Sequence, residues 1–119
     1  MKSLPALLLA TLAACGSNYP EPKQATVETI AAVRGAEMAG ASSDPNAALH
    51  LAYAKDEIAQ ARQLIADGAN RRATFVLARA KSDADLAFVL SKASAEQKEA
   101  QRVQQDVDEM RSKLEGGEP

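Results

Sequence analysis

Residues 71–114 contain neither glycine nor proline, and no other part of the chain is free of both over a comparable length. These are the two residue types that most strongly end helices, so the stretch predicts one continuous helix, about 66 Å long at roughly 1.5 Å per residue. A chain of 119 residues forms one small domain at most, of which this helix is part. The fold class that follows is all-α.

Apolar residues recur along this helix in two frames. The first part carries them at alternating intervals of four and three residues: Ala73, Leu77, Ala80, Ala84 and Ala87. The last part follows one heptad frame: Val89, Ala93, Ala100, Val103, Val107, Met110 and Leu114. The frames do not match, so the sequence predicts that the apolar stripe changes face near residues 87–93, as at a coiled-coil stutter. Around this region the chain is at its most apolar, with Phe75, Val76, Leu86, Phe88 and Leu90.

A second helix is predicted over residues 45–67. Asp44 can accept backbone N–H bonds as its N-cap, and Pro45 suits the first helical position. Its apolar stripe is formed by Leu51, Ala54, Ile58, Ala61 and Ile65, widened by Ala47, Ala52, Ala59 and Ala66. The turn at residues 67–70 contains Gly68, which can adopt the left-handed conformation, and Asn70, which can cap the next helix. So short a connection predicts an antiparallel helical hairpin.

A further helix is predicted over residues 23–39, with its stripe at Val27, Ile30, Ala31 and Met38, widened by Ala32, Val33 and Ala36. The segment 40–43 ends it. The chain is thus expected to form an antiparallel hairpin or a three-helix arrangement over residues 23–115, with a long, coiled-coil-like C-terminal helix. Residues 116–119 form a tail. Whether the first helix packs on the hairpin stays open.

The composition favours close helix packing over a large core. Hydrophobic residues make up 46% of the chain, with alanine the most frequent of them, while aromatic residues make up 3% and tryptophan is absent. Each buried alanine removes little apolar area from water. The formal net charge of −2 is spread over mixed charges, which gives no indication of nucleic-acid binding.

The N-terminal segment predicts a membrane-anchored protein. Lys2 precedes a short apolar run, residues 4–10, and the only cysteine follows in Leu12-Ala13-Ala14-Cys15. This tetrapeptide resembles the bacterial lipobox. The resemblance implies a signal peptide over residues 1–14 and a lipid on Cys15, with residues 15–22 as a tether. Gly16 stands where an aspartate would resemble an inner-membrane retention signal, so we expect the periplasmic face of the outer membrane. The alternative is a buried thiol in a cytosolic protein.

Catalytic and metal sites are not indicated. His50 is the only histidine, and a general base needs an oriented partner while zinc needs several ligands. Asp83 and Asp85 are two residues apart, so on a helix they point in different directions. We expect an edge histidine, no cofactor beyond the lipid, and a protein that is not an enzyme.

Two binding surfaces are predicted instead. Val103, Val107, Met110 and Leu114 extend beyond the reach of the hairpin partner and need another helix, which can come from the first helix, a second copy or a different protein. Arg71 and Arg72 stand at the beginning of a helix, where the helix dipole is unfavourable for cations. Together with Tyr53 they can form a groove for an anionic ligand. A plain solvated arginine pair is the alternative.

The alanine spacing resembles one known family. The run Leu51-Ala52-x-Ala54, followed by Ile58, Ala61, Leu64 and Ile65, together with the Asp44-Pro45 entry, Gly68, Ala73, Ala80 and Ala84, resembles small Ala-rich bacterial lipoproteins that carry a domain of unknown function. In some relatives that domain precedes an OmpA-like peptidoglycan-binding domain. The resemblance implies a cell-envelope lipoprotein. We expect a non-catalytic scaffold or adaptor or, alternatively, a binding module for an envelope ligand such as peptidoglycan.

Overall fold

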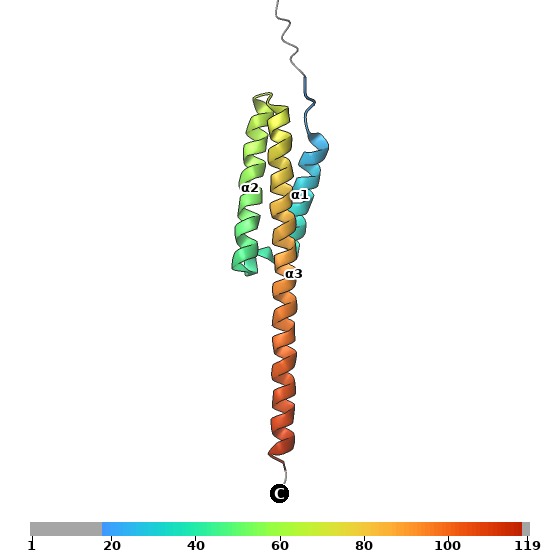
Figure 1. Cartoon of the computed structure of the whole chain (residues 1–119), viewed down its shortest axis with the longest axis vertical. Helices are drawn as coiled ribbons and strands as arrows, with labels where there is room; N and C mark the ends of the chain where they lie inside the picture. The colour runs from blue at the N-terminus through green and yellow to red at the C-terminus, as the bar shows by residue number, and fades with distance from the viewer. Residues whose placement is uncertain (1–17, 118–119) are drawn as a thin grey trace, which may run out of the picture.

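The computed structural model describes residues 18–117, and within this range the chain forms three α-helices and one short 3-10 helix. These elements are α1 (Lys23–Met38), η1 (Ala41–Ser43), α2 (Pro45–Ala66) and α3 (Asn70–Glu115). The predicted all-α fold with a long C-terminal helix is confirmed. Figure 1 shows α1 and α2 flanking the first half of α3, which then continues alone. The predicted signal peptide, Cys15 and the last two residues lie outside the described range.

Helix α2 begins as the sequence predicts. The amide of Ala47 donates to Oδ1 of Asp44 at 2.9 Å, and Pro45 occupies the first helical position. This amide hydrogen bond is the main reason why the pKa of Asp44 lies below its ordinary value, and Ser94 and Lys98 of α3 act in the same direction. The N-cap of α2 is therefore linked electrostatically to the helix beside it.

The turn between α2 and α3 depends on Gly68, whose φ of +74° lies in the left-handed region. The amides of Gly68 and Ala69 donate to the carbonyl oxygens of Ile65 and Leu64, which satisfies the end of α2. The prediction that Asn70 caps α3 is wrong. Asn70 is already the first residue of α3, and the position before it is Ala69 with no side-chain cap. Nδ2 of the Asn70 side chain instead donates to the carbonyl oxygen of Tyr19 at 2.8 Å.

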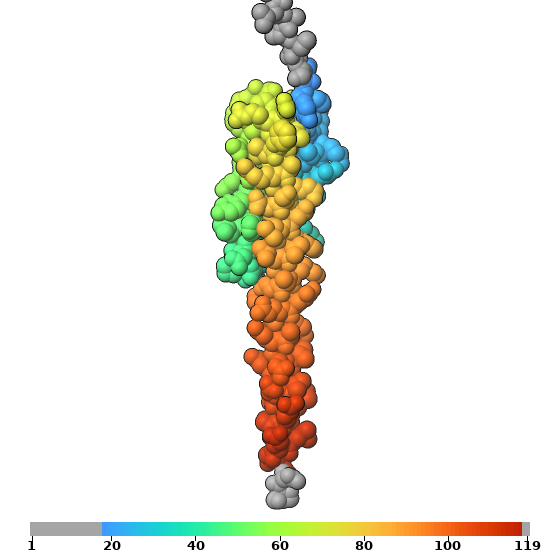
Figure 2. Space-filling view, viewed as in Figure 1, coloured from blue at the N-terminus to red at the C-terminus, as the bar shows by residue number. Residues whose placement is uncertain are grey.

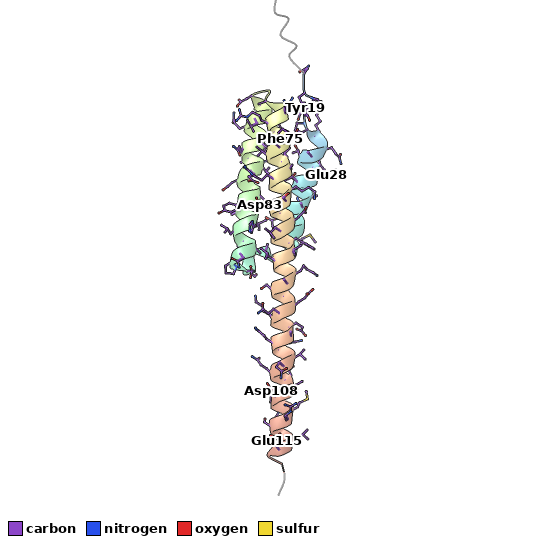
Figure 3. The ribbon with its side chains drawn as sticks, in the orientation of Figure 1. Tyr19, Glu28, Phe75, Asp83, Asp108 and Glu115 are labelled. Carbon is purple, nitrogen blue, oxygen red and sulfur yellow. The ribbon has the colours of Figure 1, made fainter. Side chains whose placement is uncertain are left out.

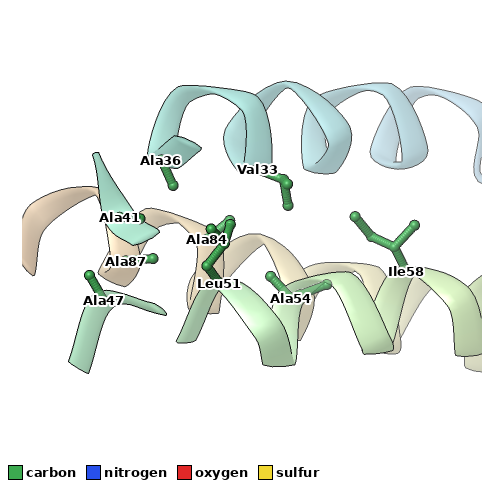
Figure 4. Close-up of a cluster of buried hydrophobic side chains, with 10 residues drawn as sticks. Val33, Ala36, Ala41, Ala47, Leu51, Ala54, Ile58, Ala84 and Ala87 are labelled. Atoms are coloured by element: carbon green, nitrogen blue, oxygen red, sulfur yellow. The ribbon is translucent and has the colours of Figure 1, made fainter. Parts of the chain in front are cut away.

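The core consists mostly of alanine. The predicted frame of α3 is fully buried, and Ser91 continues it; its members are Ala73, Leu77, Ala80, Ala84, Ala87 and Ser91. On α2 the buried residues are Ala47, Leu51, Ala54, Ile58, Ala61 and Leu64, so Leu64 takes the place expected for Ile65. In Figure 4 the small side chains of the helices face one another around Leu51, with Val33 and Ile58 at one side. Alanine at these positions lets the helix axes approach closely.

The predicted stripe of α1 is wrong in part. Val27, Ala31 and Met38 are exposed, and the buried residues are Thr29, Val33 and Ala36. The reason is a polar contact that hydrophobic periodicity does not reveal. The hydroxyl of Thr29 donates to the carbonyl oxygen of Ala25 and lies 3.2 Å from that of Leu77 on α3, so the contacting face of α1 is centred on Thr29. Helix α1 does pack on the hairpin.

The end of α3 extends beyond the other helices. Every residue from Ala95 to Glu115 is exposed, and Lys98 is the last that lies near Asp44. At about 1.5 Å per residue the part after Lys98 projects about 25 Å beyond the bundle. Figure 2 shows the single helix leaving the thicker three-helix part.

Candidate docking surface on the third helix

The four residues that the sequence assigns to a partner surface are all solvent-exposed. The exposed fractions are 49% for Val103, 42% for Val107, 63% for Met110 and 79% for Leu114. Helix α1, which was one candidate to cover them, ends instead against the first half of α3. These side chains therefore remain in water unless a second molecule covers them.

The apolar stripe does not change face along α3; two stripes run on opposite faces. Val89 follows the buried Ala87 by two residues, which at about 100° per residue places it about 200° around the helix. The exposed frame also extends backward, since Leu86 (42% exposed) precedes Val89 (59% exposed) by three residues. The two stripes overlap between residues 86 and 91, so the sequence-based prediction of a single stripe with a stutter is replaced by two faces.

We call the exposed stripe the α3 seam. It comprises Leu86, Val89, Ala93, Glu96, Ala100, Val103, Val107, Met110 and Leu114. The intervals alternate strictly between three and four residues, which is the spacing of the a and d positions of a coiled coil. In this frame Leu86 occupies an a position and Val89 a d position, and Glu96 is the one charged member. Phe75, 66% exposed, lies further back on the same side and is labelled in Figure 3.

The bundle leaves the α3 seam uncovered even where α1 and α2 are present. Helix α1 contacts α3 through Thr29 and Leu77. Helix α2 contacts it through His50 and Asp83 and through an ion pair between Glu57 and Arg79. Both contacts lie on the flanks of α3, and its remaining face is visible between α1 and α2 along its whole length in Figure 2.

Charged residues border the α3 seam on one side at seven-residue intervals. They are the g positions of the same heptads: Asp85, Lys92, Glu99, Asp106 and Lys113. Several form exposed pairs within α3, such as Lys81 with Asp85 and Lys113 with Glu109. Such exposed pairs contribute little to stability, so these charges remain available to a partner.

The structure supplies His50 with an acidic neighbour that the sequence analysis missed. Nδ1 of His50 lies 2.7 Å from Oδ1 of Asp83, and the imidazole meets the Tyr53 ring edge-on with centroids 6.0 Å apart. The hairpin register could have indicated this pair, because His50 lies 18 residues before Gly68 and Asp83 lies 15 residues after it, which places the two residues within about one helical turn of each other. The pair links α2 to α3. Within residues 18–117, no group of three His, Cys, Asp or Glu side chains could hold a metal ion.

The three weaker ligand-binding candidates lie in two places. Arg71 and Arg72 are exposed in the first turn of α3, at the hairpin end of the bundle. Tyr53 lies on α2 level with residues 79–83 of α3, as the His50–Asp83 and Glu57–Arg79 pairs show. The arginines are thus about 15 Å from Tyr53 along the helix direction.

The tether approaches this same end. The bond from Asn70 to Tyr19 fixes the chain beside the start of α3, four residues after Cys15. Four residues span at most about 14 Å. In the described part of the chain, no helix has the length and apolar character needed to cross a bilayer.

Comparisons with known proteins identify no relative. No protein-family model matches the chain, and no curated protein or solved structure matches it either. The resemblance to Ala-rich envelope lipoproteins stays a prediction.

Proposed function

We propose that this protein is a lipid-anchored, non-catalytic helical adaptor of the bacterial cell envelope, whose α3 seam binds a helix of a protein partner. The observation that carries the proposal is an exposed heptad stripe about 42 Å long on a helix that extends beyond its own bundle. Contiguous exposed apolar surface of this kind is rare on monomers and marks interaction sites. A heptad stripe is complementary to another helix.

The anchor increases the effect of a weak helix contact. Cys15 carries the lipid in this proposal, and the tether holds the hairpin end of the bundle near the membrane surface. Arg71 and Arg72 lie at that end, where anionic headgroups would favour them. Because both partners are confined near one surface, their effective concentration rises without any new contact.

A photo-crosslinking probe at Met110 tests the partner surface in native membranes. We expect a discrete crosslinked product, because Met110 belongs to the α3 seam. A probe at Gln105 is the matched control, since Gln105 is also exposed but lies about 140° around α3 from Met110. Products of equal yield from both positions, or none from Met110, would contradict the proposal.

The anchor is tested separately. Cys15→Ser should move the protein from the membrane fraction to the soluble fraction, and the intact mass of the wild-type protein should include the lipid. A wild-type protein of unmodified mass would exclude the anchor while leaving the α3 seam untouched.

A second candidate function is binding of an anionic envelope polymer such as peptidoglycan. It is supported by Arg71 and Arg72, which are exposed in the first turn of α3 without an acidic residue in that turn. Pull-down with purified peptidoglycan should lose most of the bound protein in the Arg71→Ala/Arg72→Ala variant. Equal retention of the variant would exclude this role for the arginines.

A further inference from the structure

We propose that the helix bound by the α3 seam is α3 of a second copy of this chain, antiparallel, with Ala93 of each copy opposite Val103 of the other. The inference rests on the proposed function only in taking the α3 seam as the docking surface. It adds the identity of the partner and the register.

In this register every a position meets a d position of the other copy. Leu86 lies opposite Met110, Val89 opposite Val107, and Ala93 opposite Val103. Glu96 lies opposite Ala100, which leaves room for its carboxylate to reach water past a small side chain. Each layer occurs twice because of the two-fold symmetry. No core layer therefore places two like charges opposite each other, and the two Glu96 residues lie in neighbouring layers about 6 Å apart along the axis.

The flanking charges agree with the same register. In an antiparallel pair, g positions face g positions. Asp85 then faces Lys113 of the second copy, and Lys92 faces Asp106. Both contacts are attractive and each occurs twice. Only Glu99 faces its own counterpart, at the centre of the overlap.

Other arrangements are less favourable. A parallel pair in register places Glu96 against Glu96 in a core layer, and its only attractive flanking contact joins Asp106 to Arg111. An antiparallel pair shifted by one heptad toward the C-terminus brings Lys92 opposite Lys113 and Glu99 opposite Asp106, so both of these contacts are repulsive. Like charges in such positions oppose pairing.

The overlap is long enough for a specific interface. It runs from Ser82 to Leu114, about 48 Å, and a strip one helix diameter wide covers on the order of 1,000 Å² counted over both copies. Half of each strip is the projecting part of α3, which lies beside the bundle of the second copy, and the other half belongs to the bundle of its own copy. That second half is accessible, since Leu86 and Val89 are exposed there.

The dimer has two tether ends. The first residues of the two α3 helices lie about 84 Å apart and at opposite ends of the rod. Lipid anchors on both copies are compatible with a rod that lies along one membrane surface or that connects two facing surfaces.

Disulfide trapping tests the register on residues 17–119, which contain the whole bundle and lack Cys15. The variants Ala93→Cys and Val103→Cys are oxidised separately and as an equimolar mixture. We expect a crosslinked dimer from the mixture only. Each residue lies about 15 Å along the axis from its own counterpart in the antiparallel pair. Dimers from the single variants would show a parallel pair and overturn the proposal.

Exchanging the charges of Lys92 and Asp106 provides an independent test, in which sedimentation measures the dissociation constant of the dimer. Lys92→Glu and Asp106→Lys should each raise the dissociation constant of the dimer about tenfold, and the double variant should restore it. A parallel pair predicts no effect of Lys92→Glu. A monomer at all concentrations would exclude self-association, while a Met110 crosslink to a different protein in membranes would then preserve the proposed function.

Discussion

The hydroxyl of Thr29 on α1 lies 3.2 Å from the carbonyl oxygen of Leu77 on α3, and Thr29 is 1% exposed. The single hydroxyl proton is shared between this carbonyl oxygen and the closer carbonyl oxygen of Ala25, and the contact with Leu77 joins the N-terminal helix to the long helix in the middle of the bundle. Since Leu77 is the largest fully buried side chain near it, the contact combines apolar packing with one directional bond. It holds α1 on one flank of α3, and the opposite face of α3 stays free.

Replacing Thr29 with valine keeps the shape of the side chain and removes the hydroxyl. We expect Thr29→Val to lower the free energy of unfolding by about 1 kcal/mol, the usual net value of one hydrogen bond. Thr26→Val is the matched control, because the Thr26 hydroxyl bonds only within its own segment, to the carbonyl oxygen of Pro22. Urea unfolding followed by circular dichroism measures both, and equal losses would show that the α1–α3 bond contributes nothing.

The close approach of the helices depends on alanine at fixed positions of α2. Ala54 is fully buried, whereas Ala59 on the same helix is exposed. Ala54→Leu should destabilise the fold by about 1–3 kcal/mol through overpacking, and Ala59→Leu should change stability by less than about 0.5 kcal/mol. Thermal unfolding distinguishes them. A neutral Ala54→Leu would mean that the helices are not closely packed there.

Replacing Gly68 and Gly35 with alanine should change the stability of the fold in opposite directions. Gly68 has φ +74°, so Gly68→Ala introduces a left-handed alanine and should cost about 1 kcal/mol although nothing lies within 4 Å of the added methyl. Gly35 lies inside α1 with equally open space, so Gly35→Ala should stabilise the fold by about 0.5–1 kcal/mol. If the denaturation midpoints of Gly68→Ala and Gly35→Ala moved in the same direction, the turn would not require a left-handed residue at Gly68.

The N-cap of α2 makes stability depend on pH. Folding lowers the pKa of Asp44, chiefly through the Ala47 amide, so the stabilisation is complete above the unfolded pKa and is lost as the pH falls through the folded pKa. Asp44→Asn keeps a capping oxygen without a charge, while Asp44→Ala removes the cap. We expect the difference in stability between wild type and Asp44→Asn to shrink below about pH 5. A constant difference down to pH 2 would contradict this.

Local patterns were sufficient to predict the helices and their order. Asp44-Pro45, Gly68 and the unbroken stretch after it determine where α2 begins, where it ends and how long α3 is. The buried frame of α3 was also predictable, because alanines at alternating four- and three-residue intervals define one face whatever covers it.

Contacts between distant residues were not predictable from these patterns. The face of α1 that packs on the hairpin is centred on a threonine. Apolar periodicity therefore indicated Val27 and Met38, which are exposed. Asn70 bonds to the tether instead of capping α3, since its neighbour in space is Tyr19. The heptad frame of the α3 seam was predicted from Val89 onward, but Leu86 was left out of it. A docking role was predicted only for its last four residues, because only the arrangement of α1 and α2 shows that this side of α3 is also open beside the bundle.

Amide hydrogen exchange along α3 tests the central claim, that the uncovered face of α3 binds α3 of a second copy of the chain. The experiment uses residues 17–119 at a series of protein concentrations, beside the variant Val107→Lys. We predict that amides of residues 100–114 gain protection as the concentration rises in the wild type, while those of Val107→Lys continue to exchange rapidly. Rapid exchange of residues 100–114 at every concentration, with no difference between wild type and variant, would contradict the account.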